Sequence, residues 1–117
     1  LTGDLVLDGL GNPEAVWVFQ MGSTLTTASA STVEMINSGR ALNVFWQVGS
    51  SATLGTGTQF EGNILADVSI TLDTGARLVG RALALNGAVV IDTNGTDLPI
   101  TNTPNYHILF LPLITRP

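Results

Sequence analysis

The sequence predicts an all-β protein built as a short β-solenoid, in which three-sided coils of about 18 residues stack along one axis. Two observations lead to this fold class. Gly, Thr, Ser, Val and Asn are frequent while strong helix formers are scarce, which disfavours helices. In addition, a shift of 18 positions brings residues 53–57 (Thr-Leu-Gly-Thr-Gly) onto residues 71–75 (Thr-Leu-Asp-Thr-Gly). A period near 20 with short strands and Gly-rich turns is typical of solenoids.

The repeat extends beyond these five residues. Residues 53–66 and 71–84 share seven identities in 14 positions, which chance similarity within an ordinary β-sandwich rarely gives. One coil of this length accommodates three short strands and three corners, and glycine suits corners because it adopts positive φ freely. Equivalent apolar side chains are expected to point inward and stack between coils, as Leu54, Phe60 and Leu65 on Leu72, Leu78 and Leu83.

The pattern weakens toward both ends of the chain. Residues 91–95 form a weaker copy at a shift of 19, and residues 19–22 (Phe-Gln-Met-Gly) resemble residues 46–49 (Trp-Gln-Val-Gly). We assign residues 1–97 to the solenoid domain and residues 98–117 to an extended apolar C-terminal tail strand. Alternating runs that end in Gly, Asn or Asp-Thr turns predict strands at residues 5–7, 16–20, 43–48, 68–72 and 88–91.

Composition excludes several function classes. The chain has no lysine, four arginines and a net charge of −5, so no basic patch is available for nucleic acid. It has no cysteine, which excludes disulfides and thiolate metal sites. The longest apolar run, residues 106–114, is shorter than the roughly 20 residues that span a bilayer. We therefore expect no membrane span and no nucleic-acid partner.

The sequence contains few residues that could carry out catalysis. The single histidine, His107, lies in the apolar tail, and the nine acidic residues are scattered rather than grouped as metal ligands or an acid–base pair. Asp73 and Asp92 precede threonines at equivalent corners, where an Asp that bonds its own turn is the more common arrangement than a calcium ligand. We predict no enzyme activity, no catalytic residues, no cofactor and no metal.

Seven stretches carry a resemblance to a known family. They are residues 15–20 (AVWVFQ), 43–49 (NVFWQVG), 52–56 (ATLGT), 60–66 (FEGNILA), 70–76 (ITLDTGA), 80–84 (GRALA) and 87–94 (GAVVIDTN). In these stretches and in their order, the chain resembles the ice-binding-like family, the bacterial and fungal ice-binding proteins with a discontinuous β-solenoid. The resemblance implies this fold. The Leu-Pro-Leu run at residues 111–113 resembles the ending of many secreted proteins of filamentous bacteria, which implies a secreted, extracellular or cell-surface location. It covers only the C-terminal half of the family domain, whose first half carries early coils, capping structure and a long helix packed along the solenoid.

A ladder of threonines is the main polar feature of the repeat. Since Leu54 and Leu72 are expected to point inward, Thr53 and Thr71 should point outward and stack across coils. Thr56, Thr74 and Thr93 repeat this arrangement at a corner. An array of hydroxyls and methyls on a stiff sheet can order water, and the family resemblance implies ice as its ligand. The alternative is that threonine simply suits an exposed strand.

Two functions remain open at this point, and the uncapped solenoid end and the apolar tail favour the first over the second. The first is a structural or adhesive subunit that self-assembles head to tail, because a solenoid end without a cap exposes unpaired strand edges. The apolar tail would then dock on its own solenoid or on a neighbour through Tyr106, Ile108, Phe110, Leu111, Leu113 and Ile114. The second is a monomeric ice-binding protein that uses the threonine face.

Overall fold

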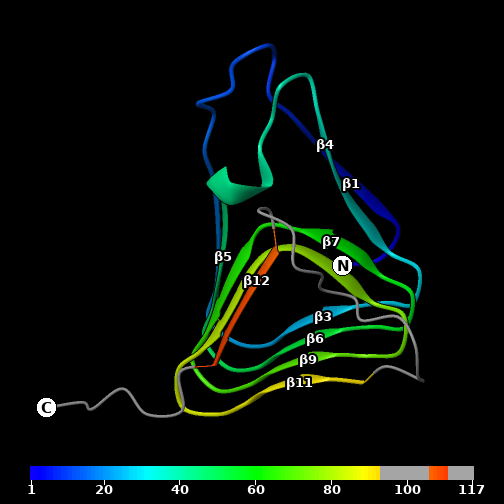
Figure 1. The fold of residues 1–117 in the computed structure, drawn as a ribbon, viewed down its shortest axis with the longest axis vertical. Coiled ribbons are helices and arrows are strands. Elements are labelled where there is room, and N and C mark those ends of the chain that lie inside the picture. Colours follow the sequence, from blue (N-terminus) through cyan, green and yellow to red (C-terminus); the bar gives the residue numbers. More distant parts are fainter. Residues whose placement is uncertain (93–105, 111–117) are drawn as a thin grey trace, which may run out of the picture.

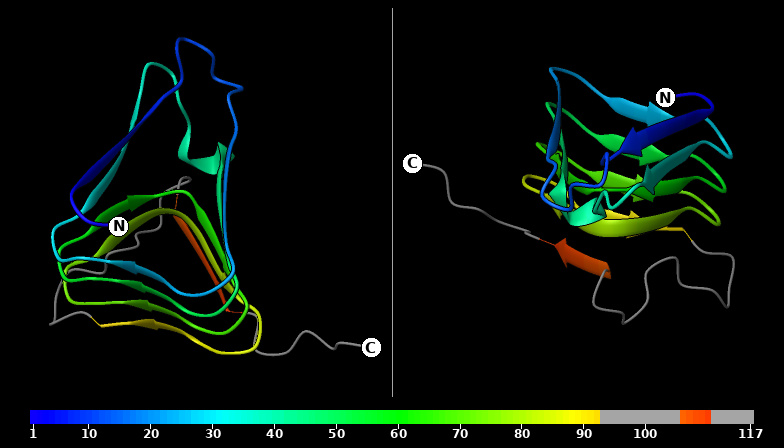
Figure 2. Two further views of the ribbon diagram at one scale, coloured as in Figure 1. Left: turned by 180° about the vertical axis from the view of Figure 1, so that it is seen from behind. Right: turned by 90° about the horizontal axis from the view of Figure 1, so that it is seen from above.

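The chain forms a three-sided β-solenoid (Figures 1 and 2). The structure is a computed structural model that describes residues 1–92 and the backbone of residues 106–110. Face A contains β1 (Asp4–Asp8), β4 (Thr32–Ile36), β7 (Gln59–Glu61) and the first part of β10 (Arg77–Ala84). Face B contains β2 (Trp17–Met21), β5 (Val44–Val48), β8 (Asn63–Ala66), the second part of β10, and β12 (Tyr106–Phe110). Face C contains β3 (Leu25–Thr27), β6 (Ala52–Leu54), β9 (Ile70–Leu72) and β11 (Val89–Ile91).

Every strand pair among the described residues is parallel. The number of positions between two paired residues is therefore the length of one coil. Ala52 pairs with Ile70, 18 positions on, and Ile70 pairs with Val89, 19 positions on. The predicted all-β solenoid with three-sided coils is confirmed, and so is the shift of 19 where Ile91 pairs with Leu72. The resemblance between residues 19–22 and 46–49 also marks equivalent positions, because β2 and β5 pair in that register.

The first two coils are longer than the repeat in the sequence predicts. Asp4 pairs with Thr32, 28 positions on, and Gln20 pairs with Gln47, 27 positions on. The additional residues lie at the corner between faces A and B. There, residues 9–16 and residues 37–43, which include the 3₁₀ turn η1 (Ala41–Asn43), form a projection at the top of Figure 1. In the third coil this corner is the single residue Gly62 between β7 and β8.

The corner glycines permit close approach between coils. Gly62 and Gly80 have φ angles of 127° and 142°, which L-residues with a side chain rarely adopt. A Cβ on Gly80 would collide with the backbone carbonyl of Gly62 in the neighbouring coil. These glycines let the chain turn from face A to face B within one residue.

The interior is a stack of apolar layers. Leu54 lies next to Leu72, and Phe60 next to Leu78, all at 0–1% exposure. An aromatic stack runs through the neighbouring coils, where the ring of Trp46 lies 4.2 Å from Phe19 and 4.8 Å from Phe60 between centroids. Burying such rings and branched side chains contributes about 1.5–3 kcal/mol each.

Two predicted inward positions are wrong. Leu65 is 41% exposed and Leu83 is half-buried, because both point outward from face B. The alternation of the strand continues from Phe60 through the glycine corner, so that even-numbered apolar positions remain inside and Leu65 lies outside. The interior positions next to the two leucines are Ile64, Ala66, Ala82 and Ala84.

Candidate functional site

Face C carries a ladder of hydroxyl side chains on its outer surface. In the registered strands, Thr26 pairs with Thr53, Thr53 with Thr71, and Thr71 with Val90. The flanking residues of each threonine point inward and are buried, which fixes the threonines on the outer side. Neighbouring strands of a sheet lie about 4.8 Å apart. The row therefore presents a hydroxyl and a methyl group at that interval along the solenoid axis.

A second row runs beside the first. Ser51 Oγ accepts a hydrogen bond from the Ser69 backbone N–H at 3.3 Å, and Ser69 Oγ accepts one from the Ala88 N–H at 3.4 Å. The serines are thus held by the backbone of the next coil. Side-chain positions fixed in this way keep the spacing of the face constant. The same sheet also buries Leu25, Ala52, Ile70 and Leu72 on its inner side.

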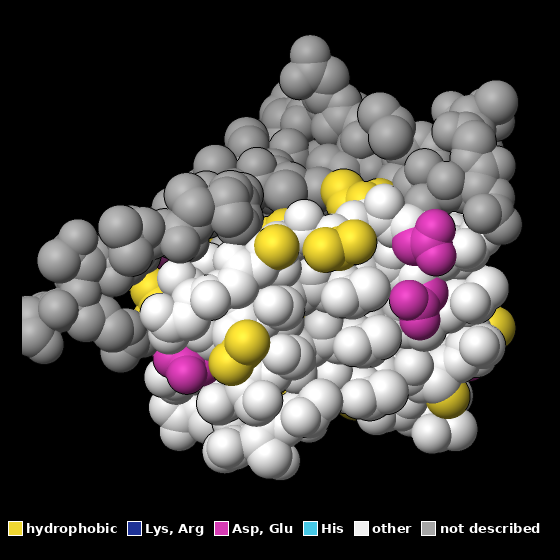
Figure 3. Space-filling view, turned by 90° about the horizontal axis from the view of Figure 1, so that it is seen from below, with side chains coloured by type: hydrophobic (Ala, Val, Ile, Leu, Met, Phe, Trp, Pro, Cys, Tyr) yellow, Lys and Arg dark blue, Asp and Glu magenta, His cyan; other side chains and the backbone are white. Residues whose placement is uncertain are grey.

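The face is nearly uncharged. Figure 3 looks onto the surface formed by β3, β6, β9 and β11 and shows no lysine or arginine there, with acidic side chains only toward its sides. Asp73 and Asp92 come directly after β9 and β11 at one corner. Val90, 49% exposed, gives the face an apolar position at the end of the threonine row. The outer surface of face C is therefore rich in methyl and hydroxyl groups and poor in ionic groups.

The structure separates the five threonines of the sequence prediction into two groups. Thr53 and Thr71 lie side by side on face C and are half-buried. Thr56 and Thr74 lie at the corner between faces C and A, where their carbonyls accept the N–H groups of Ala30 and Gly57 at 2.8 and 3.0 Å. Thr93 lies outside the described residues.

Sequence reasoning missed other members of the face. Thr26, Ser51, Ser69 and Val90 were not singled out, although they lie in the same two rows. The shift that relates residues 19–22 to residues 46–49 also brings Thr26 onto Thr53. That signal, extended by a few positions, would have found the first threonine of the row.

The tail strand lies at the far end of face B. The backbone of β12 pairs in parallel with β10, so that Tyr106, Ile108 and Phe110 pair with Gly80, Ala82 and Ala84. Leu111, Leu113 and Ile114 lie outside the described residues. Within residues 1–92 and 106–110 the structure thus gives the tail the position that a further coil would occupy on this face (Figure 2).

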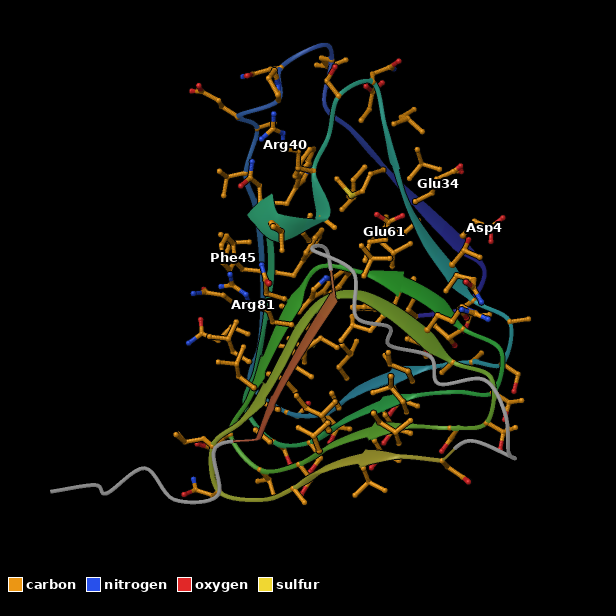
Figure 4. The ribbon with its side chains drawn as sticks, viewed as in Figure 1. Asp4, Glu34, Arg40, Phe45, Glu61 and Arg81 are labelled. Atoms are coloured by element: carbon orange, nitrogen blue, oxygen red, sulfur yellow. The ribbon has the colours of Figure 1, made fainter. Side chains whose placement is uncertain are left out.

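Titratable groups offer little chemistry elsewhere. No group of three or more His, Cys, Asp or Glu residues in the described part of the chain could hold a metal ion. Partial burial raises the pKa of Glu61, an effect that a backbone hydrogen bond from Met35 opposes and nearby Glu34 reinforces; both acids are labelled in Figure 4. The pKa of Asp8 is lowered by hydrogen bonds from the backbone of Leu10 and the side chain of Asn37. Both groups lie on face A, away from the hydroxyl rows.

Comparison with known proteins agrees with this geometry. The family model described as ice-binding-like matches residues 1–97. An ice-binding protein of Nostoc sp. (strain HG1) is 67% identical over 95 residues, which are 80% of this chain and 35% of that protein. Ice-binding protein 1 of Shewanella frigidimarina (strain NCIMB 400) is 37% identical over 94 residues, 80% of this chain and 10% of that protein.

A solved structure gives the same result. The crystal structure of an ice-binding protein from an Antarctic biological consortium aligns with a TM-score of 0.77 at 42% identity, over 92% of this chain and 45% of that chain. The chain thus spans about a third of the Nostoc relative and under half of the solved one. Among the described residues no helix is long and apolar enough to cross a membrane. On the family match and the identity to these relatives, the chain belongs to the ice-binding-like family.

Proposed function

We propose that the chain binds the surface of ice crystals through face C and thereby restrains their growth. The observation that carries this proposal is the paired row of Thr26, Thr53 and Thr71, outward on three consecutive parallel strands. The family match and the relatives named for ice binding support ice as the ligand.

The mechanism follows from what each group on the face does. Threonine methyls exclude disordered water from the spaces between the rows, while the hydroxyls donate and accept hydrogen bonds with an ordered water layer. Because the hydroxyls are fixed by the sheet, little side-chain entropy is lost when that layer freezes onto the crystal. The strength of binding then depends on the area of face C and on the regular spacing of its side chains, and no catalytic residue is involved.

This order of functions reverses the one expected from sequence. Head-to-tail self-assembly was placed first there, because uncapped strand edges and the apolar tail needed an explanation. The relatives are named for ice binding and none for an assembly, so ice binding is now the better supported proposal. Ice that such a protein meets grows in extracellular water, and we therefore also propose a secreted or cell-surface location.

The test is a pair of bulky substitutions on the face. Thr53→Tyr with Thr71→Tyr should abolish thermal hysteresis and ice recrystallisation inhibition, since the rings hold the crystal away from the other hydroxyls. The control is Gln59→Tyr, an exposed position on face A, which should leave both activities unchanged. The proposal is wrong if the unaltered chain shows neither activity, or if the double variant retains both.

A further inference from the structure

The corner between faces B and C carries an asparagine followed by a glycine in its last described coil. β10 ends at Ala84 and β11 begins at Val89, and Asn86 and Gly87 lie in the bend between them. Of the five asparagines in residues 1–92, Asn86 is the one that precedes a glycine. Its side chain is exposed, so water and hydroxide reach its amide group.

Packing against the neighbouring coil requires glycine at position 87. A Cβ there would lie 2.7 Å from the carbonyl oxygen of Val68 and would also collide with Ser69 Oγ. The Gly87 N–H makes no hydrogen bond within the described residues. The fold therefore places a backbone nitrogen that is neither hindered by a side chain nor held by an acceptor directly after Asn86.

The Asn86 side chain is held by one exposed hydrogen bond. Its Nδ2 donates to the carbonyl oxygen of Asp67 at 3.1 Å, and the same oxygen accepts the Asn86 backbone N–H at 3.0 Å. An exposed side chain leaves such a bond by rotation within nanoseconds. This rotation is far faster than any covalent change of an amide, so the bond does not block a reaction at Cγ.

We propose that Asn86 is a site of spontaneous deamidation. The Gly87 nitrogen attacks Cγ of Asn86 and forms a C–N bond, the Cγ–Nδ2 bond breaks, and Nδ2 leaves as ammonia with the proton that the Gly87 amide loses. Water then opens the resulting succinimide ring at one of its carbonyls. One opening gives aspartate, and the other gives isoaspartate, in which the main chain runs through Cβ and Cγ. Water is the only co-reactant that these steps need.

The two products differ in their effect on the solenoid. Aspartate keeps the course of the main chain but replaces a donor to the Asp67 carbonyl by carboxylate oxygens, which only accept. Isoaspartate also inserts one carbon atom into the main chain beside Gly87, where the close approach to Val68 leaves no room for it. The corner then opens, and β11, which follows it, separates from β9 at the edge of face C. This modification goes beyond ice binding and does not depend on it.

The test follows the full chain in mildly alkaline water enriched in heavy oxygen. All samples carry Asn94→Gln, which removes the other Asn-Gly pair of the sequence. Peptide mass spectrometry should find aspartate and isoaspartate at Asn86, each with one solvent oxygen, about tenfold faster than at Asn37, where the next residue carries a Cβ. Asn12, which precedes a proline without an N–H, should stay unchanged. Equal rates at Asn86 and Asn37, or an unchanged Asn86, would overturn the proposal.

Hydrogen exchange measures the consequence for face C. In chains with isoaspartate at position 86, the amides of β11 should exchange several-fold faster, while those of β6, two strands away on the same face, stay protected. Asn86→Asp is the matched control, since it adds the charge without the extra main-chain carbon and should have a smaller effect. Unchanged exchange in β11 contradicts the opening of the corner. Faster exchange in β11 of an equally aged Asn86→Gln variant, whose longer side chain cannot form the succinimide, would assign the opening to another cause.

Discussion

Thr27 and Thr58 share a hydrogen bond of 2.8 Å between their hydroxyl oxygens inside the solenoid, although 31 residues separate them. Thr27 Oγ1 also accepts the backbone N–H of Gly55 at 2.9 Å, and Thr58 Oγ1 donates to the carbonyl of Ala28 at 3.3 Å. Both side chains are buried at 0–2% exposure. The pair therefore joins two consecutive coils at the corner between faces C and A.

Replacing Thr58 by valine should destabilise the fold by about 1–3 kcal/mol, because the hydroxyl of Thr27 and the carbonyl of Ala28 would lose a buried partner. Urea denaturation measures this change. Thr26→Val is the control, since Thr26 is exposed on face C and should shift stability by no more than about 0.5 kcal/mol. Equal effects of the two variants would show that the buried pair contributes nothing to stability.

Gly80→Ala should cost about 3 kcal/mol or more, since its Cβ would meet the carbonyl group of Gly62, which cannot move without disturbing the next coil. Gly75→Ala separates this collision from backbone strain. Gly75 also has a positive φ, 74°, but its nearest atoms lie 3.8 Å away, so only about 1–2 kcal/mol is expected. Thermal melting compares the two, and a similar loss in both would argue against a collision at Gly80.

Glu61→Gln should stabilise the fold at neutral pH and leave it unchanged below about pH 4. Partial burial raises the pKa of Glu61 in the folded state, so the folded protein binds more protons than the unfolded chain between the two pKa values. The free energy of unfolding therefore falls as pH rises between the two pKa values. Above the folded-state pKa, the charged carboxylate destabilises the fold by its full amount. Denaturation midpoints from pH 3 to 8 measure the difference. Glu34→Gln, which removes a nearby like charge, should give a smaller effect of the same sign.

Trp46→Phe should cost about 1–3 kcal/mol, because Trp46 Nε1 donates to the carbonyl of Glu61 at 3.1 Å and that carbonyl would be left without this donor. The aromatic stack with Phe19 and Phe60 would be retained in part. Trp46→Ala removes the stack as well and should cost about 3–5 kcal/mol. Chemical denaturation followed by circular dichroism distinguishes the two, and a loss of similar size in both would assign the whole effect to the hydrogen bond.

The repeat could be read from the sequence where coils are equal in length. Between residues 53 and 84 each corner has the same number of residues, so identities such as Thr53 and Thr71 survive at one constant shift. The first two coils differ in the corner between faces A and B, whose loops carry no hydrophobic period. A constant shift therefore failed there, and no strand was predicted at β3 or β4. The predicted strands also omit β6, β7, β8 and β10, because their short alternating runs are interrupted by glycine and polar residues.

The inward or outward direction of side chains was the second feature that the sequence did not predict correctly. Leu65 was assigned to the core because it is apolar, although it lies five positions after Phe60 and therefore on the opposite side of the strand. The hydroxyl face was only partly found for a related reason. Ser51 and Ser69 are ordinary polar residues until the register places them beside the threonines.

The coil lengths also bear on where folding can begin. Every strand pair among the solenoid coils joins residues 18 to 28 positions apart, so adding coils would not lengthen the loops that folding must close. Closing the shorter of these loops costs about 0.4 kcal/mol less entropy than closing the longer one. The short coils around β6 to β10 also lack the projecting corner. Both differences favour nucleation in the second half of the chain, with propagation coil by coil toward Leu1.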